Sequence, residues 1–306
     1  MAELESQTVA AVVVTYNRKQ LVSQCLDGLL SQTRPLDAIY VIDNASSDGT
    51  PDVVGERYAG RVIYERLPEN IGSAGGFHHG VRCAYEHGHD WIWCLDDDAV
   101  PDSHCLQNLL HHAAPSVSFV APLIRTAKSG RLQLYHHKCH VNPRRASIIT
   151  CEELFRSSIP YQTQLEANAF PGVLVSAAAL EAAGLPDPSY FILWDDVDFT
   201  YRLTKHWRPG LLAVDAVILH HDADPTPPGT FSWKVYYFIR NRIRFYSQYT
   251  TPLGQLALLR CNFRTLLRSL MMDSRSRRSI VTAVLDGYRC CFRDRARSQL
   301  LVPRKS

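Results

Sequence analysis

The stretch WIWCLDDDAVPD, residues 91–102, joins an apolar run to three consecutive aspartates. The first five residues are apolar, which is typical of a strand buried inside a sheet. Asp96, Asp97 and Asp98 follow at once, and adjacent carboxylates repel each other. Either water screens these charges on an ordinary loop, or a cation lies among them. The second interpretation predicts a site for Mg²⁺ or Mn²⁺, because both ions prefer oxygen ligands.

The residues around this stretch alternate between strand-like and helix-like patterns. Near-continuous apolar runs separated by amphipathic segments predict a mostly parallel sheet covered by helices. One helix is expected to have Thr50 at its N-cap and Pro51 at its first position. Residues 125–160 show no regular pattern and are expected to be irregular. The apolar runs occupy residues 9–17, 36–44, 61–67, 91–95 and 119–124.

Polar residues follow the apolar runs at each expected strand end. In parallel sheets, ligands bind beyond the carboxyl ends of the strands, which lie along one edge. We therefore expect these polar residues to share a site with the aspartates. They are Tyr16 and Asn17, Asp43 and Asn44, and Asn70 to Gly72.

The glycine-rich segment NIGSAGGFHHG, residues 70–80, follows the third apolar run. Its spacing matches neither the dinucleotide fingerprint nor the P-loop. One interpretation is a tight strand-to-helix turn that needs glycine for its backbone conformation. The other is a helix N-terminus against which a nucleotide or a sugar lies closely.

A second acidic cluster, WDDVD at residues 194–198, precedes a helix-like segment. Aspartates in the first turn of a helix complement the helix dipole, which explains one or two of them. The alternative is a general base, a carboxylate close to the reacting hydroxyl group. Farther on, His220 and His221 end another apolar run, and one of them is a reasonable third metal ligand. The spacing does not separate the two histidines, and we favour His220.

Together these motifs resemble the inverting family 2 glycosyltransferases, which have the GT-A fold, over residues 9–246. VVVTYNR, VIDNASSDGT and ENIGSAGGF match the three nucleotide loops of that family. LDDD matches its metal-binding DxD motif, and WDDVD matches its acidic pair. The finer resemblance is to bacterial galactofuranosyltransferases and their rhamnosyltransferase relatives, because NxGxxGGF, DDD, WDDxD and a later RNR occur together. Ser73, where glycine is common, and His78-His79 depart from that pattern.

The resemblance implies roles for individual residues. Asp196 is the expected base, with Asp195 beside it. Asp96, Asp98 and His220 are the expected ligands of Mn²⁺ or Mg²⁺. The nucleotide-sugar donor is expected to contact Thr15, Tyr16, Asn17, Arg18, Asp43, Asn44, Asn70, Gly72, Gly75, Gly76, Asp96, Asp97, Trp194, Arg240 and Asn241.

The expected activity is transfer of a sugar to a hydroxyl group of a lipid-linked cell-envelope glycan, with inversion. UDP-galactofuranose is the favoured donor and dTDP-rhamnose the second. The chain lacks the long extra domains of polymerising relatives, so we expect a single-addition enzyme. A nucleotidyltransferase also uses aspartate-rich metal loops, but residues 11–20 lack the glycine-rich loop expected for a triphosphate. A non-catalytic sugar-nucleotide-binding module would not need Asp196.

The C-terminal part of the chain is strongly basic. Residues 234–306 contain 16 Lys and Arg against three Asp, a formal charge of +13, although the whole chain carries only +3. We therefore divide the chain into a GT-A catalytic domain, residues 1–228, and a basic helical region, residues 229–306. Residues 252–273 have leucines at helical spacing beside Arg260, Arg264 and Arg268. Such a helix either packs on the catalytic domain or binds an anionic membrane surface. Nucleic acid ranks last, because no binding motif for it occurs.

The composition is that of a globular protein, with 46% hydrophobic and 21% charged residues among 306. The first residues, MAELESQT, do not resemble a secretory signal. The nine cysteines are an odd number and include no CxxC pair, which favours a reducing compartment. We expect the protein in the cytoplasm, with possible contact with the inner face of the membrane. The HHKCH segment, residues 136–140, lacks the second cluster that a zinc site would need.

Overall fold

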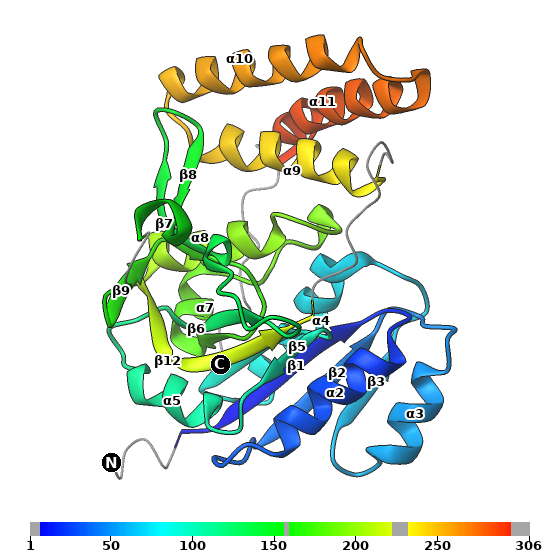
Figure 1. Cartoon of the computed structure of the whole chain (residues 1–306), viewed down its shortest axis with the longest axis vertical. Helices are drawn as coiled ribbons and strands as arrows, with labels where there is room; N and C mark the ends of the chain where they lie inside the picture. Colours follow the sequence, from blue (N-terminus) through cyan, green and yellow to red (C-terminus); the bar gives the residue numbers. More distant parts are fainter. Residues whose placement is uncertain (1–6, 156–158, 222–231, 295–306) are drawn as a thin grey trace.

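A large mixed sheet forms the centre of the molecule (Figure 1). The computed structural model describes residues 7–155, 159–221 and 232–294. Within these ranges the sheet has nine strands in the order β3-β2-β1-β4-β11-β6-β12-β5, and β9 pairs with β12. The strands of this sheet that follow β4 in the chain are β5 (Ala99–Pro101), β6 (Phe119–Thr126), β9 (Gln162–Leu165), β11 (Val173–Ser176) and β12 (Gly210–His220).

The N-terminal half of the sheet is parallel, as the apolar runs predict. β1 (Val9–Thr15) lies between β2 (Ala38–Asp43) and β4 (Trp91–Asp96), and β3 (Ile63–Arg66) pairs with β2. In this register Thr15 is opposite Asp43 and Val14 is opposite Asp96. The polar residues that follow these strands therefore begin at one edge of the sheet.

Helices cover both faces of the sheet, and alternate residues of β1 divide between two apolar clusters. Val9, Ala11 and Val13 pack with one set of helices, whereas Ala10, Val12 and Val14 pack with the other. The first set is α2 (Lys19–Leu30), α3 (Thr50–Arg57) and α5 (Cys105–His112). The second set is α4 (Gly72–Glu86), α7 (Ala177–Ala183) and α8 (Asp195–His206).

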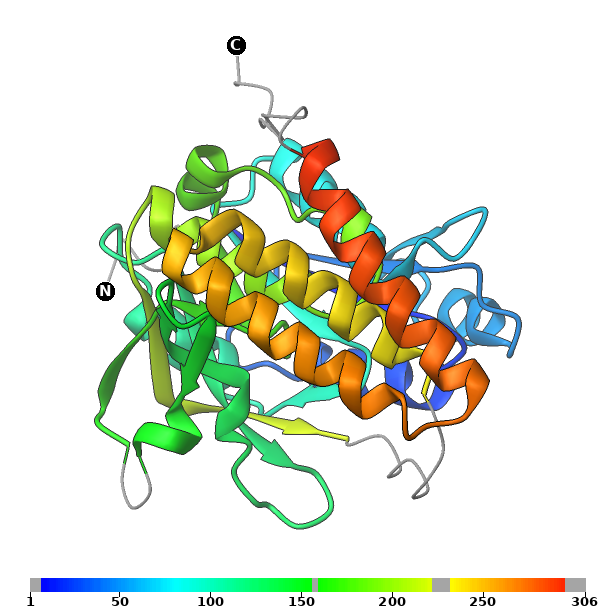
Figure 2. The ribbon, with the colours of Figure 1, turned by 90° about the horizontal axis from the view of Figure 1, so that it is seen from above.

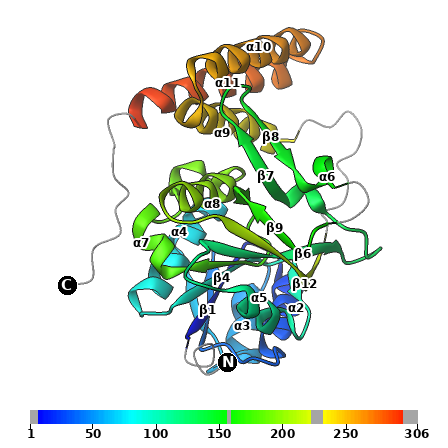
Figure 3. The same cartoon turned by 90° about the vertical axis from the view of Figure 1, so that its left-hand side faces the viewer.

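The expectation that residues 125–160 are irregular is wrong. Strand β7 (His137–Asn142) forms a hairpin with β8 (Ser147–Thr150), and β10 (Ala167–Asn168) adds a third strand. The hairpin stands between the large sheet and the C-terminal helices (Figures 1 and 3). Its strands are only partly buried, so they lack the apolar run that marks a core strand. η1 (Leu134–His136) and α6 (Cys151–Leu154) flank the hairpin.

The start of α3 also differs from the expectation. Its N-cap is Gly49, with a φ of 85°, and Thr50 is the first helical residue. The Asp48 carboxylate accepts hydrogen bonds from the backbone N–H and the hydroxyl group of Thr50. The capping oxygen therefore comes from the turn before the helix, and Thr50 is a donor to it.

Three C-terminal helices form a layer on the side of the catalytic domain that carries α8 (Figures 1–3). α9 (Lys234–Tyr249) is the inner helix, because Ile243 and Phe245 pack against Val197 and Tyr201 of α8. α10 (Pro252–Ser269) and α11 (Ser274–Asp294) complete the layer. The expected boundary between residues 228 and 229 lies outside the described residues. No helix in the described ranges is long and apolar enough to cross a membrane.

Candidate active site

The triple acid is paired with the loop that follows β1. Thr15 Oγ1 donates to Asp97 Oδ2 over 2.8 Å. The Arg18 guanidinium bridges Asp97 and Asp98. Its Nη1 lies 2.9 Å from Asp97 Oδ1 and 2.7 Å from Asp98 Oδ2. Asp97 and Asp98 are both buried. Arg18 therefore offsets part of the repulsion that the sequence alone leaves unexplained.

The three carboxyl groups differ in their protonation. Burial and the charge of Asp98 together raise the pKa of Asp96 to about 8, although His220 opposes the shift. Burial also raises the pKa of Asp97 to about 6, although Arg18 opposes the shift. Burial alone would raise the pKa of Asp98 too, but His220 and Arg18 together hold it below its ordinary value. Asp98 is therefore the member of the triple acid that is held ionised.

His220 lies against Asp98 at the end of β12 (Gly210–His220). Its Nε2 is 3.3 Å from Asp98 Oδ1, and its Nδ1 is 3.1 Å from Gln133 Oε1. Asp98 Oδ1 is buried and lacks an aligned hydrogen bond. A buried carboxylate oxygen of this kind, beside an imidazole, fits a divalent cation. His221 contributes its backbone N–H to the Asp98 carbonyl over 2.9 Å.

Among the described residues, the ligand atoms of Asp96, Asp98 and His220 are not grouped within 4.8 Å of one another, whereas those of another cluster are. In the part of the chain that the structure describes, one triad of potential ligands has all its ligand atoms within 4.8 Å of one another, and it is Glu65, His79 and Cys83. His79 Nε2 lies 2.8 Å from Glu65 Oε2 and 3.6 Å from Cys83 Sγ. Arg82 Nη2 is 3.2 Å from the other ring nitrogen of His79. Glu65 lies on β3, and His79 and Cys83 lie one turn apart on α4; sequence reasoning missed them because their meeting depends on how two different elements are placed.

The second acidic cluster sits on a constrained turn before α8. Phe191, Leu193 and Trp194 have positive φ angles of 65°, 65° and 70°. Bulky residues rarely adopt this conformation, so the surrounding structure must hold it. The amide of Asn241 does so, because Nδ2 donates to the carbonyl oxygens of Tyr190, Ile192 and Leu193 over 3.0, 2.9 and 2.8 Å.

Asp195 and Asp196 form the first turn of α8. Asp195 is buried, and burial and the neighbouring Asp196 charge hold its pKa well above the ordinary range. Burial raises the pKa of the half-buried Asp196 as well, while hydrogen bonding from Val197 and the charge of Lys138 oppose the shift. The charge of Asp196 also raises the pKa of Asp96. The two acidic clusters therefore act on each other electrostatically.

The three expected nucleotide loops are tied to one another. The Asn17 N–H donates to Ser46 Oγ over 2.8 Å, and Asn44 Nδ2 donates to the Gly72 carbonyl over 3.2 Å. Asn70 Oδ1 accepts the Gly72 N–H over 2.9 Å. Tyr16 is 45% exposed, so its ring is available to a ligand.

Asp43 and the glycines of α4 are less accessible than expected of donor contacts. Asp43 is fully buried and accepts from Tyr64 Oη over 2.6 Å and from the Ser46 N–H over 2.9 Å. A Cβ atom on Gly72 would lie 2.0 Å from the Phe191 carbonyl oxygen, and one on Gly76 would lie 2.5 Å from Val14 Cγ1. Gly75 has the Ile71 side chain in the same position. These glycines permit α4 to pack closely on β1 and on the acidic turn.

Three other expected donor contacts lie between the acidic turn and α9. Trp194 packs among Phe238, Phe245 and Tyr246, with ring centroids 5.3–6.0 Å apart. Arg240 Nη2 donates to the Tyr190 carbonyl over 2.7 Å, and Asn241 is fully buried. In this structure these side chains hold the turn in place.

Sequence reasoning did not single out Lys138, a residue of β7 whose charge lowers the pKa of Asp196. Burial lowers the pKa of Lys138, and the charge of Asp196 raises it. Asp198 belongs to the WDDVD motif, but its contacts are structural. It accepts from Tyr190, Tyr249 and Arg202 and so joins α8 to α9.

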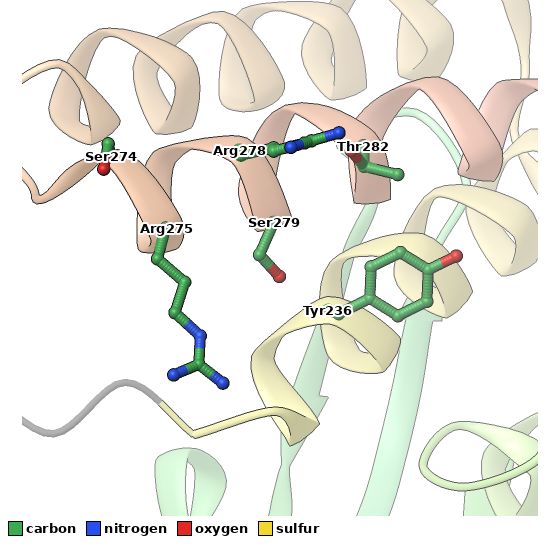
Figure 4. A pocket seen from close by; sticks show the side chains of 6 residues that line it. All are labelled: Tyr236, Ser274, Arg275, Arg278, Ser279 and Thr282. Atoms are coloured by element: carbon green, nitrogen blue, oxygen red, sulfur yellow. The ribbon is translucent and has the colours of Figure 1, made fainter.

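A separate pocket lies between α9 and α11 (Figure 4). It encloses about 580 Å³ and is cationic and rich in hydroxyl groups. Its lining residues are Tyr236, Ser274, Arg275, Arg278, Ser279 and Thr282. None of them belongs to the acidic edge of the sheet.

The large, mostly parallel sheet flanked by helices is the GT-A glycosyltransferase fold. Two solved glycosyltransferase structures share this fold with the chain. GalNAc-T7, solved with UDP, GalNAc and Mn²⁺, gives a TM-score of 0.62 at 12% identity and covers 97% of this chain and 59% of its own. TarS of S. aureus gives 0.58 at 15% identity and covers 92% of this chain and 49% of its own. At these identities the likeness shows the fold alone.

The chain belongs to glycosyl transferase family 2, whose family model matches residues 10–176. It is 35% identical over 221 residues to the galactofuranosyltransferase GlfT1 of Mycobacterium tuberculosis, 70% of each chain. It is 33% identical over 236 residues to GlfT1 of Mycolicibacterium smegmatis, 75% of this chain and 74% of that one. The protein is therefore a family 2 glycosyltransferase.

Proposed function

We propose that this enzyme transfers galactofuranose from UDP-galactofuranose to a hydroxyl group of a lipid-linked cell-envelope glycan, with inversion at the anomeric carbon. The observation that carries the donor and the sugar is the similarity to the mycobacterial galactofuranosyltransferases over 70% or more of the chain. The acidic edge of the sheet carries the chemistry.

Asp196 is the proposed general base. An acceptor hydroxyl group has a pKa far above neutrality, so its proton must leave as it attacks the anomeric carbon. Burial raises the pKa of Asp196, which makes it a better proton acceptor than an ordinary carboxylate. One base is enough, because the leaving group is a diphosphate and needs no second carboxyl group to protonate it.

Asp98, His220 and Asp96 are the proposed residues for Mn²⁺ or Mg²⁺. The ionised Asp98, whose buried Oδ1 has only the imidazole of His220 nearby, offers the strongest ligand of the three. A cation bound there would supply positive charge for the leaving diphosphate. Arg18 holds Asp98 through Oδ2 and so fixes the direction of Oδ1, the oxygen that faces His220.

The first loop and the second acidic turn are the proposed limits of the donor site. Tyr16 is exposed beyond β1, and Asn17 and Arg18 join it to the second loop and to the triple acid. Lys138 of β7 acts electrostatically on Asp196, because its charge lowers the pKa of that carboxyl group. We therefore place the acceptor between the β7–β8 hairpin and the turn before α8.

The donor is tested by thermal unfolding in the presence of UDP, dTDP, GDP and CDP, with Mg²⁺, with Mn²⁺ or with EDTA. We expect UDP to raise the midpoint most, and only when a divalent cation is present, since bound ligand stabilises the folded state. A selective shift by dTDP would instead support a rhamnosyltransferase. Transfer of a nucleotide from a nucleoside triphosphate would support a nucleotidyltransferase. No response to any nucleotide would contradict the proposal.

A further inference from the structure

The outward face of α10 is apolar. A helix on the outside of a water-soluble domain normally turns polar residues outward. On α10 the side chains at spacings of three and four residues are instead large, apolar and 48–62% exposed. We call this set the α10 apolar stripe: Leu253, Leu256, Leu259, Phe263, Leu267 and Leu270.

The stripe is not the core face of a helix that has failed to pack. Another face of α10 is already buried through Gly254, Leu258 and Asn262. Asn262 accepts from Arg242 of α9 and donates to Tyr288 of α11. In Figures 1 and 2, α10 is the helix of the C-terminal layer farthest from the sheet. The stripe therefore faces out of a helix that is held in place from behind.

Along α10 itself, the charged residues beside the stripe are all positive. Arg260, Arg264 and Arg268 each follow a stripe residue by one position and are exposed. Residues 252–269 contain no Asp or Glu, and the start of α11 adds further arginines. An apolar stripe flanked by cations is complementary to a surface with anionic groups over hydrocarbon.

We propose that α10 docks the enzyme on an anionic membrane surface, lying in the plane of the lipid headgroups with its apolar stripe inserted. A second copy of the chain is a poorer occupant, because pairing two stripes would bring two rows of arginines together. The arginines of a docked helix would meet lipid phosphates instead. This inference rests on α10 alone and does not depend on the proposed donor.

The docking surface is connected to the active site through the β7–β8 hairpin. The Thr251 N–H at the start of α10 donates to the Pro143 carbonyl at the hairpin tip over 3.0 Å. A Cβ atom on Gly254 would lie 2.1 Å from that same oxygen, so the contact is close. Lys138, on β7 of the same hairpin, acts electrostatically on Asp196 by lowering its pKa. A membrane under α10 would therefore lie on the side of the molecule where we place the acceptor.

The test is flotation of the full-length protein with vesicles. One set contains phosphatidylcholine alone, and the other contains equal parts of phosphatidylcholine and phosphatidylglycerol, each at low and high salt. The apolar variant is Leu256→Ser with Phe263→Ser, and the basic variant is Arg260→Gln, Arg264→Gln and Arg268→Gln. The matched controls are Ile63→Ser, at an exposed apolar residue of β3, and Arg61→Gln.

We expect wild type and both controls to float with the anionic vesicles at low salt. The apolar variant should lose about tenfold or more of its vesicle partitioning, in proportion to the apolar surface removed. The basic variant should lose the preference for phosphatidylglycerol and the salt dependence. Circular dichroism and thermal unfolding establish that each variant is folded, which is expected because every changed side chain is exposed.

Absence of wild-type flotation on anionic vesicles would overturn the inference, as would variants that bind like wild type. Light scattering of the wild type and the apolar variant tests whether a second copy of the chain, instead of a membrane, covers the stripe. A wild-type dimer that the apolar variant converts to a monomer would assign the stripe to a second copy and overturn membrane docking. A wild-type monomer in solution is the result we expect.

Discussion

Three adjacent aspartates at the end of β4 differ because their neighbours differ. Asp97 is buried and Asp96 half-buried, and both have too little positive charge nearby to keep their pKa values low. Asp98 has Arg18 on one oxygen and His220 near the other. A cation placed beside Asp96 would reverse the shift of its pKa, since positive charge favours the carboxylate.

Removal of divalent cations should make stability depend on pH through Asp96. Its pKa of about 8 in the folded state lies above the ordinary value of 3.8. Between those values the unfolded chain binds fewer protons than the folded one, so the free energy of unfolding falls as pH rises. Thermal unfolding in EDTA across this window should therefore show a falling midpoint, measured as the difference between wild type and Asp96→Asn.

The matched control is Asp52→Asn, at an exposed carboxylate in the first turn of α3. It should keep the wild-type slope in EDTA, and saturating Mg²⁺ should flatten the slope of both proteins at the upper end of the window. An Asp96→Asn slope equal to that of wild type would show that Asp96 is not held protonated.

At the scale of elements, the turn before α8 takes its shape from α9. Asn241 supplies one buried amide to three backbone carbonyl oxygens. The RNR motif that contains it is thus joined by hydrogen bonds to the turn that precedes the acidic pair, although about 50 residues separate them. The turn and α9 form one unit that sets the position of Asp196.

Asn241→Ala should lower both stability and turnover, because the carbonyl oxygens lose their donor while buried. We expect a loss of about 1–3 kcal/mol in the free energy of unfolding from denaturant titration. The turnover number should fall while UDP affinity changes little. Asn108→Ala, which removes a surface amide bonded to the Asp215 carbonyl, is the control and should alter neither. A fall in UDP affinity with unchanged turnover would assign Asn241 to the donor site instead.

The first residue of α4 offers a second test of how elements meet. Gly72 has a φ of 78°, and a Cβ atom would lie 2.0 Å from the Phe191 carbonyl oxygen. Gly72→Ala should therefore destabilise the fold by about 1 kcal/mol or more and displace the acidic turn. Gly55→Ala is the control, since no atom lies within 4 Å of its added Cβ in α3. It should stabilise the protein by up to about 1 kcal/mol, measured by the same denaturant titration.

The elements differ in how far the sequence predicts them. The parallel strands were predictable because they are buried on both faces and read as continuous apolar runs. The β7–β8 hairpin was not, since half-exposed short strands carry no such run. Lys138 was missed with it. The positions of Asp96, Asp98 and His220 near one edge were predictable from strand ends, whereas the burial of Asp43 and Asn241 depends on side-chain contacts distant in sequence.

At the scale of the whole molecule, the C-terminal layer lies beyond α8 from the large sheet, and α10 is its outermost helix (Figure 1). The sequence left open whether residues 252–273 pack on the catalytic domain or face a membrane. The structure shows that α10 does pack through one face, while its leucines remain exposed on another. Helical spacing alone could not distinguish these faces, because both carry leucine.

The most direct measurement is transfer from UDP-galactofuranose to a lipid-linked glycan acceptor by wild type, Asp196→Asn and the surface control Asp52→Asn. We predict that wild type and the control turn over, whereas Asp196→Asn loses about 10²- to 10⁴-fold in turnover and still binds UDP. The product should carry the transferred sugar in the inverted configuration. Full turnover by Asp196→Asn, or no transfer by folded wild type supplied with Mn²⁺, would contradict the proposal that this acidic edge is a galactofuranosyl-transfer site.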